Sequence, residues 1–243
     1  MKKSILLTAL LALIIIGGCR KNDDTPSPPE CRIVKITNGT TVHSINYYPD
    51  GKVRTINANN NTVLNCKYSG NTIIRTTLVN GLFDEKSIIT LNNDGMVKNV
   101  RTETNSGGTQ WNNNAYEYSE ARVTKRTFTN SSGITPWVRN YVWMDGNIVS
   151  VLNPEDGIGT EYQFHTDKLM QVGDFFGTIS DLMQYGTINA FYKNKNLLKA
   201  TVSSSGTFIT NYDYVFDASG KIISLNVVSG TSSDTYQYEY QCH

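Results

Sequence analysis

The chain has 243 residues and a formal net charge of +1, with 22 Lys and Arg against 21 Asp and Glu. A chain this close to neutrality lacks the basic surface that drives binding to nucleic acid, so we expect no nucleic-acid partner. The 14 tyrosines are typical of a secreted β-rich protein. The length fits a single domain, because all-β folds often reach about 200–250 residues as one unit.

Residues 1–18 are typical of an export signal. Lys2 and Lys3 give a basic start, and residues 5–16 are almost wholly apolar, a run shorter than the roughly 20 residues of a permanent membrane helix. The segment ends Gly17-Gly18-Cys19, which resembles the lipobox of bacterial lipoproteins. The resemblance implies a lipid on Cys19 and attachment to a membrane. Loss of the two signal lysines would lower the formal charge from +1 to −1.

Residues 19–30 predict a tether in front of the folded domain. The run Pro26-Ser27-Pro28-Pro29 favours an extended, semi-rigid backbone. Asp23 and Asp24 resemble the export signal that sends lipoproteins of the Bacteroidota to the outer face of the outer membrane, although Asn22 separates them from Lys21. We therefore expect an outer-membrane, lipid-anchored protein displayed at the cell surface, with the periplasmic face as the alternative.

Residues 31–243 repeat one hairpin pattern and predict a single domain. Aromatic residues at alternate positions precede a glycine turn, and a β-branched strand returns. The clearest copies contain Gly51, Gly70, Gly95, Gly146 and Gly220. Rings opposite Val or Ile are favourable cross-strand partners. The pattern predicts a meander of seven or eight hairpins.

The return strands carry apolar residues three positions apart instead of two. These pairs are Val53/Ile56, Val97/Val100, Ile148/Val151, Leu169/Val172 and Ile222/Leu225. A flat strand would send one member of each pair to the wrong face, so we expect a bulge in each return strand. Repeated bulges curl a sheet. The predicted fold is all-β, an antiparallel meander forming a strongly curved sheet, either a half-barrel or an open barrel; partial covering of both faces is the alternative.

Residues 174–186 break the strand pattern and predict one short helix near 174–184. The apolar positions 175, 176, 179, 182 and 183 have helical spacing, with Asp174 as N-cap and Gly186 as stop. We expect this helix in the concave face of the sheet or at one end, covering apolar side chains.

Three cysteines remain once Cys19 is assigned to the lipid. A disulfide between Cys31 and Cys242 would tie the two ends of the domain together if the first and last strands are neighbours. Pairing of Cys31 with Cys66 and three buried thiols are the alternatives, and spacing does not decide among them.

The sequence predicts no catalytic residues, no metal site and no cofactor. None of the three histidines, His43, His165 and His243, stands in a metal-ligand spacing. Neither a nucleophile motif nor a phosphate-binding glycine loop occurs. Glu155-Asp156 could serve a glycosidase, but the segment is typical of an Asp-Gly turn.

Trp111 and Trp137 are the candidate ligand platform. Both lie in long polar loops and precede the tyrosines of the next hairpin by four or five residues, so we expect them to be neighbours. Exposed indoles beside Asn and Gln amides could stack on sugar rings and bind hydroxyl groups. The alternative is that each tryptophan only extends its strand and packs on the sheet.

The hairpin of residues 212–222 resembles the YD repeats of Rhs-type β-shells. Lys52, Asn71, Met96 and Lys221 replace the arginine that typically follows the glycine of those repeats. The lipobox, the proline tether, Cys31, the turn at 91–95, the late helix and Asn196-Leu197-Leu198 together resemble a group of uncharacterised Bacteroidota lipoproteins. The resemblance implies a surface or periplasmic binding protein and carries over no activity.

These observations favour a non-enzymatic binding or scaffold module whose partner is a glycan or an envelope protein. This binding hypothesis predicts a polar concave face or exposed Trp111 and Trp137. The alternative is a carrier of a lipid or other apolar ligand, held in a half-barrel cavity beneath the 174–186 helix.

Overall fold

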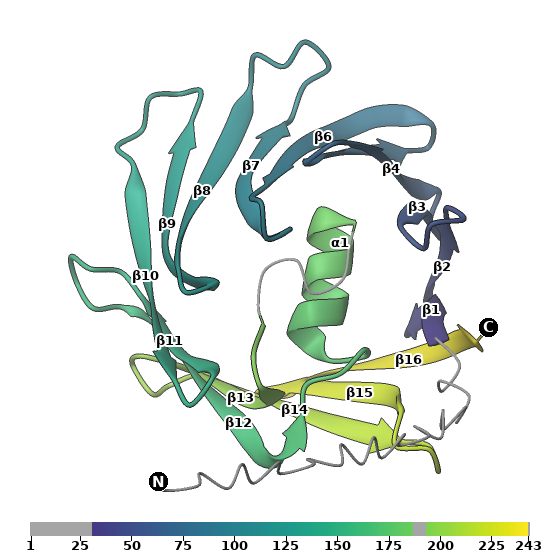
Figure 1. The fold of residues 1–243 in the computed structure, drawn as a ribbon, viewed down its shortest axis with the longest axis vertical. Coiled ribbons are helices and arrows are strands. Elements are labelled where there is room, and N and C mark those ends of the chain that lie inside the picture. Colours follow the sequence, from purple (N-terminus) through teal and green to yellow (C-terminus); the bar gives the residue numbers. More distant parts are fainter. Residues whose placement is uncertain (1–30, 187–192, 243) are drawn as a thin grey trace, which may run out of the picture.

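The computed structural model describes residues 31–186 and 193–242; the predicted signal and tether, with Cys19, lie outside the described residues. Over the described ranges, sixteen antiparallel strands form one closed barrel in which neighbours in the chain are neighbours in the sheet (Figure 1). The prediction of an all-β meander with one short helical segment is therefore confirmed. No helix within these ranges is long and apolar enough to cross a membrane.

The strands and helices have the following bounds. The strands are β1 (Cys31–Asn38), β2 (Thr41–Tyr47), β3 (Val53–Ala58), β4 (Thr62–Ser69), β5 (Thr72–Val79), β6 (Leu82–Leu91), β7 (Val97–Glu103), β8 (Trp111–Ser119), β9 (Arg122–Asn130), β10 (Trp137–Met144), β11 (Asn147–Leu152), β12 (Gly159–Leu169), β13 (Asn196–Ser203), β14 (Ile209–Phe216), β15 (Ile222–Ser229) and β16 (Ser232–Cys242). Between β12 and β13 lie a π-helical turn, η1 (Phe175–Ser180), and α1 (Asp181–Tyr185).

The sheet is closed, and the prediction of a half-barrel or open barrel is wrong. Strand β1 pairs with β16 along its length, from Cys31 opposite Cys242 to Asn38 opposite Tyr236. A disulfide joins Cys31 to Cys242, so the first and last described residues are linked covalently. Hairpin spacing predicts curvature, but closure depends on sixteen strands bringing the two edges together, which is a property of the whole sheet.

The predicted bulges are present in most return strands. In β3, Thr55 pairs with Asn46 and Val53 pairs with Tyr47, which leaves Arg54 as the extra residue. The same shift leaves Lys98, Val149 and Ile223 as extra residues in β7, β11 and β15. Four of the five predicted apolar pairs therefore lie at a bulge and face inward. The Leu169/Val172 prediction is wrong, because Leu169 ends β12 and is 66% exposed.

The helical segment lies inside the barrel, as Figure 1 shows. Ile179 and Leu182 belong to an apolar cluster with inward side chains of β1–β4 and β13–β16. Tyr185 belongs to a second cluster, formed by β5–β11. The predicted helix is thus confirmed at 174–186, in the concave face. Its burial there completes a core that the wall alone could not fill.

Polar contacts fix both ends of this segment. Asp174 caps the N-terminus and accepts a hydrogen bond from the Gly177 amide at 3.2 Å. At the other end, Arg75 on β5 donates to the Gln184 carbonyl at 2.6 Å, and the Tyr68 hydroxyl donates to the Gly186 carbonyl at 3.0 Å. The wall therefore holds the helix in one orientation.

The two ends of the barrel differ. Strand order places Cys31, Cys242 and the short turns such as 92–96 at one end, here called the terminal end. The longer loops 104–110, 131–136 and 153–158 lie at the opposite end, here called the loop end. The chain enters the barrel interior from the terminal end after β12. The loop end is therefore the face farther from both described termini.

Candidate functional site

Trp111 and Trp137 lie on opposite faces of the barrel wall. Trp137 pairs with Phe128, and Phe128 pairs with Asn114. Directly paired residues project to the same face, so Trp137 points inward with Asn114 and Tyr116. Trp111 is three positions from Asn114 on the same strand and points outward. The expectation that the two tryptophans are neighbours is wrong.

Outside the barrel, Trp111 forms part of a local charged cluster. The Arg101 guanidinium carbon lies 4.9 Å from the centre of the Trp111 ring. The same side chain donates to Glu103 and to the Gly108 carbonyl. Trp111 is half-buried by these contacts. It therefore packs on the outer surface in the way that the alternative interpretation expected.

Inside the barrel, Trp137 belongs to a group of four residues that we call the rim cluster: Arg126, Phe128, Trp137 and Arg139. The Phe128 and Trp137 rings are stacked, with centroids 5.0 Å apart and an interplanar angle of 15°. The guanidinium carbons of Arg126 and Arg139 lie 4.7 Å and 5.2 Å from the Trp137 ring centre. Both Trp137 and Arg126 are half-buried, so the cluster is reachable from solvent.

Arg126 connects the rim cluster to a cavity of about 300 Å³ that we call the basin. The basin is lined by Arg75, Glu85, Ser87, Val100, Thr102, Asn114, Tyr116, Arg126, Gln184 and Tyr185. These residues lie on the inner wall of β5–β9 and on α1. They sit on the loop-end side of the apolar cluster that contains Val97 and Val123. Gln184 is exposed although its helix is inside the barrel, because solvent reaches the basin.

The floor of the basin is held by a polar network. Arg75 pairs with Glu85 and contacts the Ser87 hydroxyl at 3.2 Å. The Tyr116 and Tyr185 hydroxyl oxygens lie 3.5 Å apart. Burial raises the pKa of both tyrosines, so both stay protonated at neutral pH. The basin therefore offers hydroxyl, amide and guanidinium groups in a fixed arrangement.

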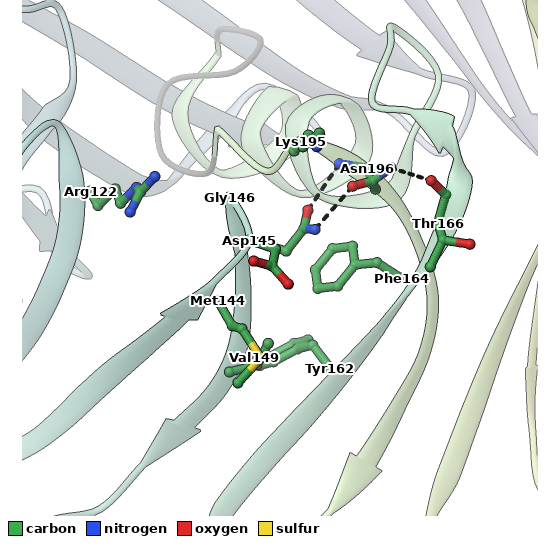
Figure 2. A pocket seen from close by; sticks show the side chains of 11 residues that line it. Arg122, Met144, Asp145, Gly146, Val149, Tyr162, Phe164, Thr166, Lys195 and Asn196 are labelled. Carbon is green, nitrogen blue, oxygen red and sulfur yellow. Dashed lines mark hydrogen bonds between the residues drawn. The ribbon is translucent and has the colours of Figure 1, made fainter.

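A second cavity, of about 800 Å³, lies in the wall where β11 and β12 diverge (Figure 2). The two strands pair over three residues only, Ser150–Leu152 against Gly159–Glu161. Toward the terminal end they separate, and we call this opening the seam. Figure 2 shows Phe164 projecting from β12 into it, toward Asp145. The barrel is closed in topology but locally unpaired at this point.

Side chains replace the missing strand pairing along the seam. Asn194 Oδ1 accepts a hydrogen bond from the Ile148 amide at 2.9 Å, in the place of a β12 carbonyl. Asn147 and Asn196 bind each other through two hydrogen bonds of 3.1 Å and 2.9 Å, drawn in Figure 2. The Lys195 amide donates to the Gly146 carbonyl at 2.9 Å. The seam is therefore a stable feature, because its buried polar groups have partners.

The seam is lined by apolar and polar groups in similar measure. Val149, Tyr162 and Phe164 come from the two diverging strands, and Met144 at the edge is 61% exposed. The remaining lining residues are Arg122, Asp145, Gly146, Asn147, Thr166, Lys195 and Asn196. Such a lining suits an amphipathic molecule.

The described residues contain no group of three or more His, Cys, Asp or Glu side chains that could hold a metal ion. Burial lowers the pKa of His43 and of His165. Asp156 accepts a hydrogen bond from the Ile158 amide at 2.8 Å, within the turn between β11 and β12. Cys66 is a buried free thiol, and burial raises its pKa to about 11. His243 lies outside the described residues.

Sequence reasoning missed the rim cluster and the seam. The signal for the rim cluster was present, because Trp137 and Arg139 share the strand parity of Tyr141, an inward core residue. Trp111 has the opposite parity to Tyr116 and Tyr118 on its own strand. The seam had no comparable signal, since it depends on where the chain returns after the helix.

No family model and no curated protein matches the chain. Solved structures do match it. A porin-like protein from Bacteroides uniformis has a TM-score of 0.62 and 12% identity, over 86% of this chain and 96% of that chain. A porin-like protein from Bacteroides vulgatus has a TM-score of 0.62 and 13% identity, over 87% of this chain and 99% of that chain. At this level of identity the likeness shows a shared barrel fold.

Proposed function

We propose that the protein is a non-enzymatic envelope lipoprotein that binds a saccharide at the rim cluster and basin. The observation that carries this proposal is the inward Phe128–Trp137 stack beside a cavity lined with amide, hydroxyl and guanidinium groups. Aromatic faces stack on the C–H faces of sugars, and the polar groups around them bind hydroxyls. The rim cluster and basin form a polar region of an otherwise apolar concave face, with Trp137 on the inner side of the wall and Trp111 on the outer side.

The position of the site suits a protein anchored through a lipid on Cys19. The 12-residue tether leads to Cys31 at the terminal end, and an extended chain of that length spans at most about 40 Å. The basin lies toward the loop end and would therefore face away from the membrane. The porin-like neighbours from Bacteroides favour an outer-membrane or other envelope setting.

The polarity of the wall favours lipid anchoring over insertion of the barrel itself. Cross-strand ion pairs of 2.7, 2.8 and 3.1 Å lie on the outer face: Lys35–Glu239, Lys125–Glu117 and Lys86–Glu103. Apolar side chains fill the interior instead. Barrels that span membranes have the reverse arrangement, with an apolar outer band and a polar lumen.

Thermal unfolding of the detergent-solubilised lipoprotein with a panel of neutral and acidic oligosaccharides tests the proposal. A ligand at about 100 times its Kd adds roughly 2.7 kcal/mol, a shift of several degrees for a domain of this size. We expect the shift to disappear in Trp137→Ala and to persist in Trp111→Ala, the matched control on the outer face. Absence of binding across the whole panel would overturn the proposal.

A carrier of an apolar or amphipathic ligand is the second candidate, and the seam favours it. The carrier hypothesis predicted a cavity beneath the helix, and that prediction is wrong, because Ile179 and Leu182 pack into the core there. The seam instead exposes Val149 and Phe164 in a cavity of about 800 Å³. Binding of a fluorescent fatty acid, abolished by Val149→Gln and unchanged in Trp137→Ala, would favour the carrier. No fatty-acid binding by the unsubstituted protein would exclude it.

A further inference from the structure

Arg126 and Arg139 lie directly opposite each other on β9 and β10. Like charges at directly paired positions destabilise a sheet. Neither guanidinium forms an ion pair with a carboxylate among residues 31–186 and 193–242. On the outer wall, by contrast, opposite charges are paired, as where Lys35 lies directly opposite Glu239. The inner arginine pair therefore carries an uncompensated charge of +2.

The contacts of the two arginines fix their position and leave donors free. Arg126 Nε donates to Asn114 Oδ1 at 2.8 Å, and Arg139 Nη1 donates to the Val138 carbonyl at 3.4 Å. A guanidinium has five N–H donors, so most donors of both groups lack a protein acceptor in the described structure. Both groups also lie beside the Trp137 ring, which orients them.

Arg75, the other arginine that lines the basin, differs from this pair. Arg75 has its charge balanced by Glu85, its Nη1 atom donates to the carbonyls of Met183 and Gln184, and its Nη2 atom donates to Glu85 and Ser87. It serves the fold and is not available to a ligand. Among the arginines of the basin and the rim cluster, the free cationic surface is therefore confined to Arg126 and Arg139, next to the aromatic stack.

We propose that Arg126 and Arg139 bind an oxyanion carried by the saccharide, a carboxylate of a uronic acid or a sulfate ester. Guanidinium groups bind both oxyanions through paired, charge-assisted hydrogen bonds. A sugar ring packed against the Phe128–Trp137 stack would bring such a substituent within reach of both arginines. The ligand then supplies the negative charge that the wall lacks. The inference rests on the proposed saccharide function and names the class of saccharide.

Calorimetric titration of the lipoprotein tests it with four probes: an oligogalacturonate, a sulfated oligosaccharide, a neutral oligosaccharide of the same length, and inorganic sulfate. We expect at least one acidic oligosaccharide to bind tenfold or more tightly than the neutral one, with affinity falling as salt rises. The two acidic probes distinguish the carboxylate from the sulfate ester.

Substitutions separate this inference from the proposed function. Arg126→Gln and Arg139→Gln should each weaken binding of the acidic ligand at least tenfold and weaken binding of the neutral one much less, because a glutamine amide can still bind a sugar hydroxyl but cannot balance the charge of an oxyanion. The affinity of Arg139→Lys for the acidic ligand should lie between those of the unsubstituted protein and Arg139→Gln, because lysine keeps the charge and loses the planar guanidinium. Lys125→Gln, next to Arg126 but on the outer face, is the matched control and should bind normally. Unchanged urea midpoints would show that the variants fold.

Three outcomes would overturn the inference. Equal affinity for neutral and acidic oligosaccharides, lost only in Trp137→Ala, would leave the saccharide function standing without the oxyanion site. Binding of sulfate alone, insensitive to Trp137→Ala, would reduce the pair to a site for free anions. Failure of every oligosaccharide to bind would remove the proposed function together with the inference.

Discussion

Arg75 on β5 donates from Nη1 to the carbonyl oxygen of Gln184 at 2.6 Å, so a strand of the wall terminates the helix inside the barrel. The last carbonyls of a helix lack partners within the helix, and a cation placed there also interacts favourably with the helix dipole. The side chain of Arg75 is 8% exposed and is also paired with Glu85. One residue thus links the barrel wall, the helix and the basin floor.

We expect Arg75→Met to lower the free energy of unfolding by about 2–4 kcal/mol, because it removes the cationic partner of the partly buried Glu85 and the donor to the helix carbonyls. Urea denaturation measures the change. Lys125→Met is the control, since its pair with Glu117 is exposed and should contribute less than about 1 kcal/mol. A loss below 1 kcal/mol in Arg75→Met would mean that apolar packing alone holds the helix.

Gly186 ends the helix at a place where a side chain has no room. Its φ is +67°, and a Cβ there would lie 2.3 Å from the Cys66 Sγ. We expect Gly186→Ala to cost about 2–4 kcal/mol, from backbone strain and overpacking together. In a Cys66→Ala background the overpacking should vanish, so the same change should cost only about 1–2 kcal/mol. A double-mutant cycle by urea unfolding measures this coupling, and strict additivity would contradict it.

The buried carboxyl of Asp174 should make the free energy of unfolding depend on pH. It is 2% exposed, and burial raises its pKa to about 6, against the hydrogen bonds from Gly177 and Thr178 that lower it. Because the folded pKa lies above the unfolded value, the protonated carboxyl stabilises the fold at low pH. This contribution is complete below about pH 4 and is lost as the pH rises through 6.

The comparison with Asp174→Asn isolates this contribution from the histidines, whose lowered pKa values act in the opposite direction. We expect the unfolding free energy of the wild type, relative to the variant, to fall by about 2 kcal/mol between pH 4.5 and pH 7.5. Chemical denaturation of both proteins at the two pH values measures it. A difference that stays constant with pH would show that Asp174 does not titrate in this range.

The disulfide between Cys31 and Cys242 links the first and last strands of the barrel. Because Cys31 and Cys242 are 211 positions apart, their bond removes much conformational entropy from the unfolded state. We expect Cys242→Ser to lower the free energy of unfolding by about 2–5 kcal/mol. A reductant should lower the thermal midpoint of the wild type toward that of the variant and should leave the variant unchanged. If the reductant lowered the thermal midpoint equally in both proteins, the disulfide would not be the source of the stabilisation.

The amino-acid sequence by itself predicts the local structure of this protein. Alternating aromatics, turn glycines and apolar residues three apart predict strands, reversals and bulges, because each depends on neighbours within about ten positions. Asp174 and Gly186 likewise mark the ends of the helical segment. The same alternation assigns Trp137 to the inner face and Trp111 to the outer one, once each strand is compared with its own tyrosines.

Only the tertiary structure decided how these elements combine. Closure depends on β1 meeting β16, and the opposition of Arg126 and Arg139 depends on the register between β9 and β10. The seam depends on Asn194 and Asn196 reaching β11 after the chain has passed through the interior. These contacts join residues distant in sequence and are selected by the packing of the whole barrel around its helix. Periodicity along the chain carries no record of them, because it reports which face a residue takes and not which residue it will meet.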